Sequence, residues 1–161
     1  MPTARRIEEI RDELTELAGT VSNPPELMRA MVKVLHKRML KYNWVGFYML
    51  EPGAKPPMLA LGAFEGAMTP HTRIPLNQGI CGAAASSGQT VVVDDVSKDP
   101  RYLACSLETK SEIVVPIFVH GKVVGELDID SHFAAAFNSE HQNLVQHCAR
   151  LVGKKLETAG H

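Results

Sequence analysis

The chain has 161 residues, 45% hydrophobic and 22% charged, with a formal net charge of −1. This balance excludes a general electrostatic attraction to nucleic acid or to acidic membranes. The length fits one domain, residues 1–161. No stretch approaches the roughly 18 apolar residues of a membrane span, and the charged start lacks the apolar centre of a secretion signal. We therefore expect a cytoplasmic protein with no membrane or nucleic-acid partner.

Two helices are expected at the N-terminus. Apolar residues recur there at spacings of three and four, which predicts an amphipathic helix within residues 1–22. Its apolar stripe could pack on the same domain or form the contact of a homodimer. Asn23, followed by Pro24 and Pro25, predicts the capped start of a second and more buried helix.

The middle of the chain predicts a strand hairpin and a short helix. Aromatic and β-branched residues predict a strand that places Trp44 and Tyr48 on one face. A small-residue run closed by Gly88 predicts the helix. The expected ranges are 44–50 and 58–65 for the two strands, 67–77 for an irregular segment or short edge strand, 79–87 for the helix and 90–93 for a further short strand.

A second hairpin is expected from residues 111–119 and 122–131, which flank His120 and Gly121. A two-residue type I′ loop would force His120 to positive φ. We therefore favour a three-residue loop in which Gly121 takes the left-handed position of a bulge. In that register Glu112 lies opposite Asp128.

The order of elements predicts an α+β fold. An antiparallel sheet would carry the N- and C-terminal helices on one face. Loops and the short helix would form a ligand pocket on the other face. The C-terminal helix is expected to open with a capping box at residues 139–142.

The three cysteines occupy unlike settings. The cytoplasm keeps thiols reduced, which favours catalytic, redox, metal or buried roles over structural disulfides. Cys81 lies near the start of the short helix, where the helix dipole favours a thiolate, although a small buried core residue is the alternative. Cys105 lies in a polar loop, residues 94–110, where no core pattern requires a cysteine. Cys148 falls on the apolar stripe of the last helix, which indicates a core residue.

Three acids, Glu112, Asp128 and Asp130, share one face of the second hairpin. They form either a solvated face or a pocket. In a pocket, repulsion and burial would raise at least one pKa, so that a protonated carboxyl donates a hydrogen bond while ionised neighbours hold a ligand ammonium group. Such a pocket suits an amino acid. Trp44 and Tyr48 could wall it for a methyl or thioether group, or could be plain core residues.

A metal or organic cofactor is not expected. A zinc site built from Cys81, Cys105, His71 and an acid has no recognisable ligand spacing.

With these residues in view, the chain resembles GAF domains, and more closely the free methionine-(R)-sulfoxide reductases built on that fold. The resemblance runs from about Asn43 to the closing helix. It rests on the following motifs: Asn43 to Tyr48, Arg73 to Pro75, Gly79 to Gly82, Leu103 to Cys105, Ser111 to Val114 and Leu127 to Ser131.

The resemblance implies roles for the residues at these positions. Cys105 would be the nucleophile and Cys81 would resolve it to a disulfide, which thioredoxin or a similar dithiol would reduce. The three acids would bind and polarise free methionine sulfoxide, with Trp44 and Tyr48 as the pocket wall. A GAF module that senses a small molecule without catalysis is the alternative.

Two positions depart from the family pattern. His71 stands where many members carry a further cysteine, so a resolving route through that position is absent. Ser106 replaces the acid that usually follows the nucleophile.

Overall fold

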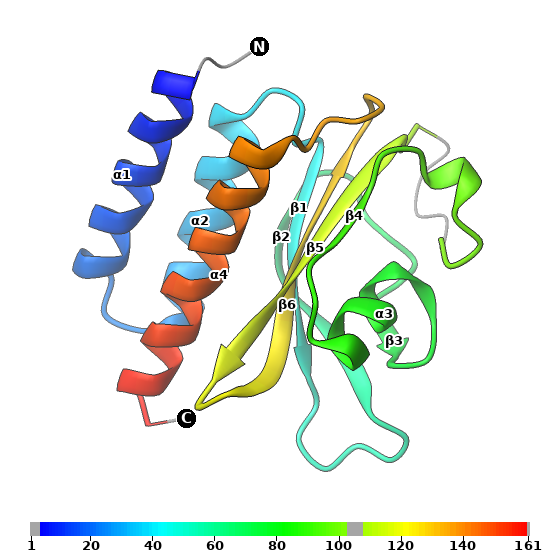
Figure 1. Ribbon diagram of the computed structural model, residues 1–161. Coiled ribbons are helices and arrows are strands. Elements are labelled where there is room, and N and C mark those ends of the chain that lie inside the picture. The colour runs from blue at the N-terminus through cyan, green and yellow to red at the C-terminus, as the bar shows by residue number, and fades with distance from the viewer. Residues whose placement is uncertain (1–3, 103–107, 161) are drawn as a thin grey trace.

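The computed structural model describes residues 4–102 and 108–160 (Figure 1). The helices are α1 (Ala4–Thr20), α2 (Pro24–Arg38), α3 (Gly79–Ser87) and α4 (Ser139–Thr158), with a short 3₁₀ turn η1 (Val96–Lys98). The strands are β1 (Trp44–Leu50), β2 (Met58–Glu65), β3 (Arg73–Pro75), β4 (Val91–Val93), β5 (Ser111–Val119) and β6 (Lys122–Ser131). These bounds agree with the predicted elements to within a few residues, and the ambiguous segment 67–77 contains the edge strand β3.

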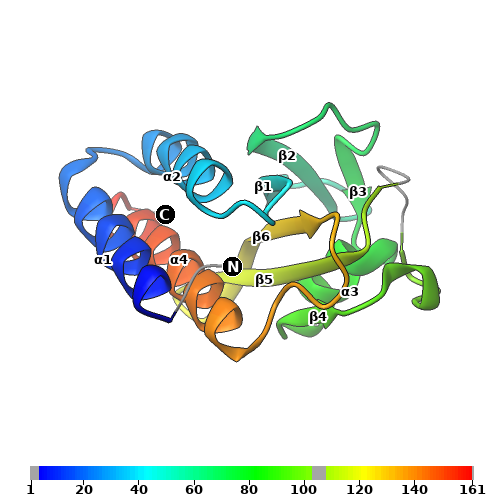
Figure 2. The same cartoon turned by 90° about the horizontal axis from the view of Figure 1, so that it is seen from above.

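The described strands form one antiparallel sheet in the order β3-β2-β1-β6-β5-β4. Figure 2 shows α2 and α4 against one face of the sheet and α1 outside them. The short helix α3 lies on the opposite face. The predicted α+β architecture is therefore confirmed.

The apolar stripe of α1 is buried within the chain. Ile7, Ile10 and Leu14 are all less than a tenth exposed, and α1 packs on α4 and α2. Packing on the same domain is thus the alternative that the structure supports, while a dimer contact through residues 1–22 stays a prediction. Among the described residues, no helix combines the length and apolar composition that crossing a membrane requires.

The sheet separates two apolar cores. The larger core joins the sheet to α1, α2 and α4, and it contains Cys148. The smaller core lies between the sheet and α3, and it includes Tyr48, Ile80 and Cys81. Alternation along the strands sends every second side chain to the α3 side. Glu112, Asp128 and Asp130 are buried hydrophilic residues on that side.

The turn between β5 and β6 differs from the prediction. His120 and Gly121 have φ angles of 50° and 78°, and Val119 pairs with Lys122. The loop is therefore a two-residue one with both φ angles positive, and the predicted three-residue loop is wrong. A turn of this hand matches the twist of the flanking strands, which offsets the cost of positive φ at a histidine.

A bulge in β6 corrects the register beyond this turn. Ile117 pairs with Gly125 and Phe118 with Val123, which leaves Val124 as the extra residue. Glu112 consequently lies opposite Asp130, not opposite Asp128 as predicted. The extra residue restores the side-chain parity that the shorter loop removed, so the predicted common face of the acids is retained.

The start of α4 also differs by one residue. Asn138 is the N-cap, and its side-chain oxygen accepts a hydrogen bond from the backbone N–H of His141. The predicted capping box at residues 139–142 is therefore wrong. Asparagine caps a helix as well as serine does, and Asn138 stands one residue earlier.

Candidate active site

Three carboxylates converge on the α3 side of the sheet. Glu112 comes from β5 and Asp128 and Asp130 come from β6, and their exposed fractions are 5%, 4% and 4%. The alternative of a solvated acidic face is therefore excluded. Because the strands alternate, the residues between these acids point into the larger core and fix the strands in place.

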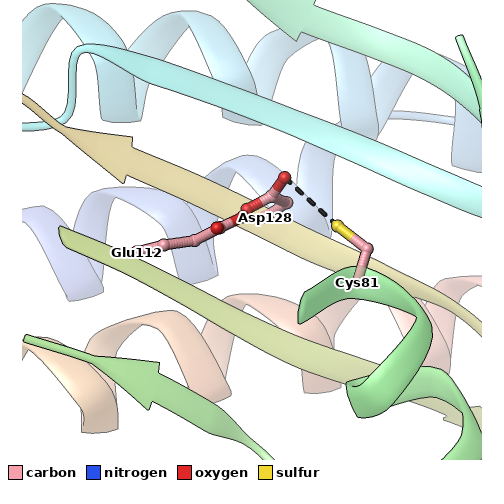
Figure 3. A group of neighbouring side chains, drawn as sticks. All are labelled: Cys81, Glu112 and Asp128. Atoms are coloured by element: carbon pink, nitrogen blue, oxygen red, sulfur yellow. Dashed lines mark hydrogen bonds between the residues drawn. The ribbon is translucent and has the colours of Figure 1, made fainter. Parts of the chain in front are cut away.

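Cys81 lies directly above these acids. It is the third residue of α3, it is 5% exposed, and its thiol donates a hydrogen bond to Asp128 Oδ2 at 3.3 Å (Figure 3). Cys81, Glu112 and Asp128 line a cavity of about 20 Å³ together with Tyr48 and His71. A cavity of this size holds about one water molecule or ion.

The Cys81 thiol is not activated in this arrangement. Burial raises the pKa of Cys81 well above its ordinary value, and the neighbouring charges of Asp128 and Glu126 raise it further. The expectation that the helix start favours the thiolate is therefore wrong for this state. Removing a thiolate from water and placing it beside carboxylates outweighs the partial positive charge of a helix N-terminus.

Burial shifts the pKa values of the three acids. Burial raises the pKa of Glu112 well above its ordinary value, and the charges of Asp128 and Asp130 raise it further. Burial and then the charge of Asp128 likewise raise the pKa of Asp130 well above its ordinary value. The pKa of Asp128 is also raised by burial, while hydrogen bonds from Glu112, Cys81 and Asp130 lower it. Burial therefore raises the pKa of all three acids, as is expected for acids that share a pocket.

Trp44 and Tyr48 stand beside this cluster on β1. Their ring centroids are 6.2 Å apart. The Tyr48 hydroxyl donates a 2.6 Å hydrogen bond to the carbonyl oxygen of His71, and Trp44 Nε1 donates one of 3.0 Å to the carbonyl oxygen of Ala67. Trp44 and Asp130 line a second cavity of about 150 Å³. The Trp44 ring and the Asp130 carboxyl group thus border a space large enough for a small organic molecule, while Tyr48 lines the smaller cavity.

Glu126 is a further buried acid that the sequence analysis missed. It is 0% exposed, and alternation along β6 places it on the same face as Asp128 and Asp130. Burial raises its pKa well above the ordinary value. The single hydrogen of the Cys81 thiol is donated to Asp128, so it is not available to Glu126. Neither side-chain oxygen of Glu126 has a hydrogen-bond partner within the described residues. The acids at every second residue, 126, 128 and 130, are the sequence signal that could have identified Glu126 as a member of the cluster.

The remaining predicted residues are placed as follows. Cys105 lies outside the described residues. Cys148 is buried in the larger core, as predicted, and burial raises the pKa of its thiol to about 12. For a metal, the described residues offer one ligand atom each from Cys81, Glu112 and Asp128, all within 4.8 Å of one another.

Comparison with known proteins places this architecture in a family. Residues 23–156 match the GAF domain model. The chain belongs to the GAF domain family. The resemblance inferred from the motifs is thereby confirmed, and the sheet with α2 and α4 on one face and α3 on the other is the GAF fold.

Relatives of this GAF domain include free methionine-R-sulfoxide reductases. The free methionine-R-sulfoxide reductase of Escherichia coli is 34% identical over 144 residues, which are 89% of this chain and 80% of that protein. The structure of free methionine-R-sulfoxide reductase from Neisseria meningitidis, in complex with its substrate, superposes with a TM-score of 0.90 at 32% identity and covers 97% of this chain and 91% of that one. The type II enzyme of Thermoplasma acidophilum gives a TM-score of 0.78 at 39% identity, covering 84% and 93%. The GAF domain described here is thus homologous to free methionine-R-sulfoxide reductases over most of its length.

Proposed function

We propose that this protein reduces free methionine-(R)-sulfoxide to methionine by thiol chemistry. The observation that carries the proposal is the buried cluster in which the Cys81 thiol contacts Asp128 beside Glu112 and Asp130, whose pKa values burial raises. This cluster occurs in a chain whose relatives include reductases of this substrate. Neither a metal nor an organic cofactor is needed.

The acids provide the binding chemistry for a free amino acid. We assign the negative charge of the cluster to Asp128, because hydrogen bonds from its neighbours partly offset the rise that burial causes in its pKa. An ammonium group placed beside this carboxylate would gain a strong ion pair. The protonated carboxyls of Glu112 and Asp130 can donate hydrogen bonds to a carboxylate or to a sulfoxide oxygen. Trp44 and Tyr48 supply apolar surface for the S-methyl group. A peptide-bound methionine lacks the free ammonium group, so we expect the site to select the free amino acid.

The first chemical step is assigned to Cys105 from the family resemblance. Its thiolate sulfur bonds to the sulfoxide sulfur while a protonated carboxyl transfers a proton to the oxygen. The protonated oxygen then passes from the substrate sulfur to the Cys105 sulfur. The sulfur–oxygen bond of the substrate and the transient sulfur–sulfur bond break, an oxygen–sulfur bond forms at Cys105, and methionine leaves a sulfenic acid behind. The substrate is reduced by two electrons, and the cysteine is oxidised by two.

The second step recycles the oxidised thiol. Cys81 attacks the sulfur of the Cys105 sulfenic acid, a disulfide forms as the sulfur–oxygen bond breaks, and the hydroxyl group departs as water after taking the proton of the Cys81 thiol. An external dithiol of the thioredoxin type then reduces the disulfide in a reducing compartment such as the cytoplasm. Cys81 has a raised pKa in the present arrangement, so this step requires Asp128 or Glu126 to accept its proton.

The decisive assay measures loss of methionine sulfoxide with a dithiol donor, comparing the R and S forms and the free and peptide-bound substrates. Free R substrate should be consumed fastest by far. A Cys105→Ser variant should lose turnover, and a Cys81→Ser variant should complete one turnover and then stall unless a small thiol rescues it. Cys148→Ala is the matched control, because this cysteine lies in the opposite core, and it should retain turnover.

The alternative of a non-catalytic GAF sensor makes a different prediction. In that case Cys105→Ser would bind and release small molecules as the wild type does, and neither protein would consume the sulfoxide. Full activity in Cys105→Ser would overturn the assigned mechanism.

A further inference from the structure

Three side chains of the site converge from separate elements. Cys81 extends from α3, Glu112 from β5 and Asp128 from β6 (Figure 3). The thiol sulfur and one carboxylate oxygen of each acid all lie within 4.8 Å of one another, and the sulfur is 3.3 Å from Asp128 Oδ2. All three residues are buried, so packing of the sheet against α3 holds them in this arrangement.

Several acceptors around this group lack donors. Asp128 Oδ1 and both oxygens of Glu126 make no hydrogen bond within the described part of the chain. Glu126 is fully buried. Among the described residues that line the small cavity, there is no lysine or arginine. Buried acceptors without donors are costly, and a cation bound at Asp128 would offset part of this cost.

The ligand atoms select the kind of cation. Mg²⁺ and Ca²⁺ prefer six or more oxygen ligands, whereas one sulfur with two carboxylate oxygens suits Zn²⁺. With Zn–S near about 2.3 Å and Zn–O near about 2.1 Å, a tetrahedral site has an S–O edge of roughly 3.6 Å. The observed separation of 3.3 Å is close to this edge. The cavity of about 20 Å³ accommodates one bare ion and excludes a hydrated one.

We propose that the reduced protein binds one zinc ion between Cys81, Glu112 and Asp128, and that zinc and the sulfoxide substrate exclude each other. The second part rests on the proposed function, since the ion would occupy the carboxylate assigned to the substrate ammonium group. Zinc would thus hold the reductase in an inactive state. Disulfide formation at Cys81 removes the thiolate ligand, so the oxidised protein should release the ion.

The binding test is equilibrium dialysis of the full chain, reduced with a phosphine, against about 10 µM zinc chloride. The wild type should retain one zinc per chain. Cys81→Ser and Asp128→Asn should each bind at least about 100-fold more weakly, because each loses a direct ligand. Cys148→Ala, whose thiol lies in the opposite core, should bind as the wild type does. Circular dichroism establishes that each variant is folded before dialysis.

The outcomes separate this inference from the proposed function. Cys105→Ser should keep its zinc although it loses turnover, and zinc should raise the apparent KM for methionine sulfoxide in the wild type without lowering kcat. Equal zinc retention by wild type and Cys81→Ser would place the ion on surface histidines and overturn the site. Absence of bound zinc in the wild type would do the same. Zinc binding with unchanged substrate kinetics would refute mutual exclusion, whereas zinc binding by a protein with no reductase activity would refute only the proposed function.

Discussion

Replacing Gly82 with alanine tests whether close packing of α3 positions the Cys81 thiol. A Cβ atom at residue 82 would lie 2.8 Å from the carbonyl oxygen of Leu76 and 3.1 Å from that of Pro75. Both are backbone atoms. The Leu76 oxygen also accepts a 2.7 Å hydrogen bond from the Ser86 hydroxyl, so it cannot turn away without breaking that bond. Either α3 or the preceding loop must therefore move by roughly half an ångström.

The expected magnitude combines two opposing effects. Alanine favours the helix over glycine by about 1 kcal/mol, while overpacking costs about 1–3 kcal/mol. Because the neighbouring atoms are backbone and one of them is hydrogen-bonded, we expect the upper part of that range and a net loss of about 1–2 kcal/mol. Gly19→Ala is the matched control, since Gly19 lies in α1 with nothing within 4 Å of the added Cβ. It should gain about 0.5–1 kcal/mol.

Urea denaturation of the two variants and the wild type measures these free energies of unfolding. The rate at which iodoacetamide alkylates Cys81 supplies a second measurement, made in a Cys105→Ser background. Displacement of α3 should expose the thiol and accelerate alkylation in Gly82→Ala. If Gly82→Ala is as stable as Gly19→Ala, and its alkylation rate is unchanged, the close approach of α3 to the loop does not hold the thiol in place.

Three further predictions concern buried or strained positions. Tyr42→Phe should lower the free energy of unfolding by about 1–3 kcal/mol in urea, because it removes the 2.7 Å hydrogen bond between the Tyr42 hydroxyl and His141 Nδ1. Burial lowers the pKa of His141, so the folded state disfavours the charged imidazole. The free energy of unfolding of the wild type should therefore fall as pH drops from about 6.5 through that lowered pKa, and His141→Gln should remove this part of the pH dependence. His120→Asn should stabilise by about 0.5 kcal/mol in thermal unfolding, because asparagine tolerates the positive φ of 50° better than histidine does, and a lower Tm would contradict the turn assignment.

The sequence alone identified the elements because their signals are local. Helix periodicity, the Asn23 cap with its prolines and the Gly88 stop depend on neighbours within one or two turns. Alternation placed Asp128 and Asp130 on one face of their strand without knowledge of the partner strands. The family motifs then supplied an expectation about chemistry that no periodicity contains.

The register between β5 and β6 could not be predicted from local sequence patterns. The turn at His120 and the extra residue Val124 each shift the side-chain parity of β6 by one, and the two shifts cancel. The common face was therefore predicted correctly from a wrong loop. Choosing between Asp128 and Asp130 as the residue opposite Glu112 requires the bulge, whose position depends on how β6 packs between β5 and β1.

The protonation state of the site was decided by tertiary structure. From the sequence, Cys81 at a helix start is expected to favour the thiolate. In the fold, α3 lies flat on the sheet above Asp128 and Glu126, and the loss of water together with these charges reverses the shift. Residue types and spacing can therefore name a thiol and its acids, but the free energy of each charge depends on burial and on neighbours from other strands, which only the assembled sheet and helix bring together.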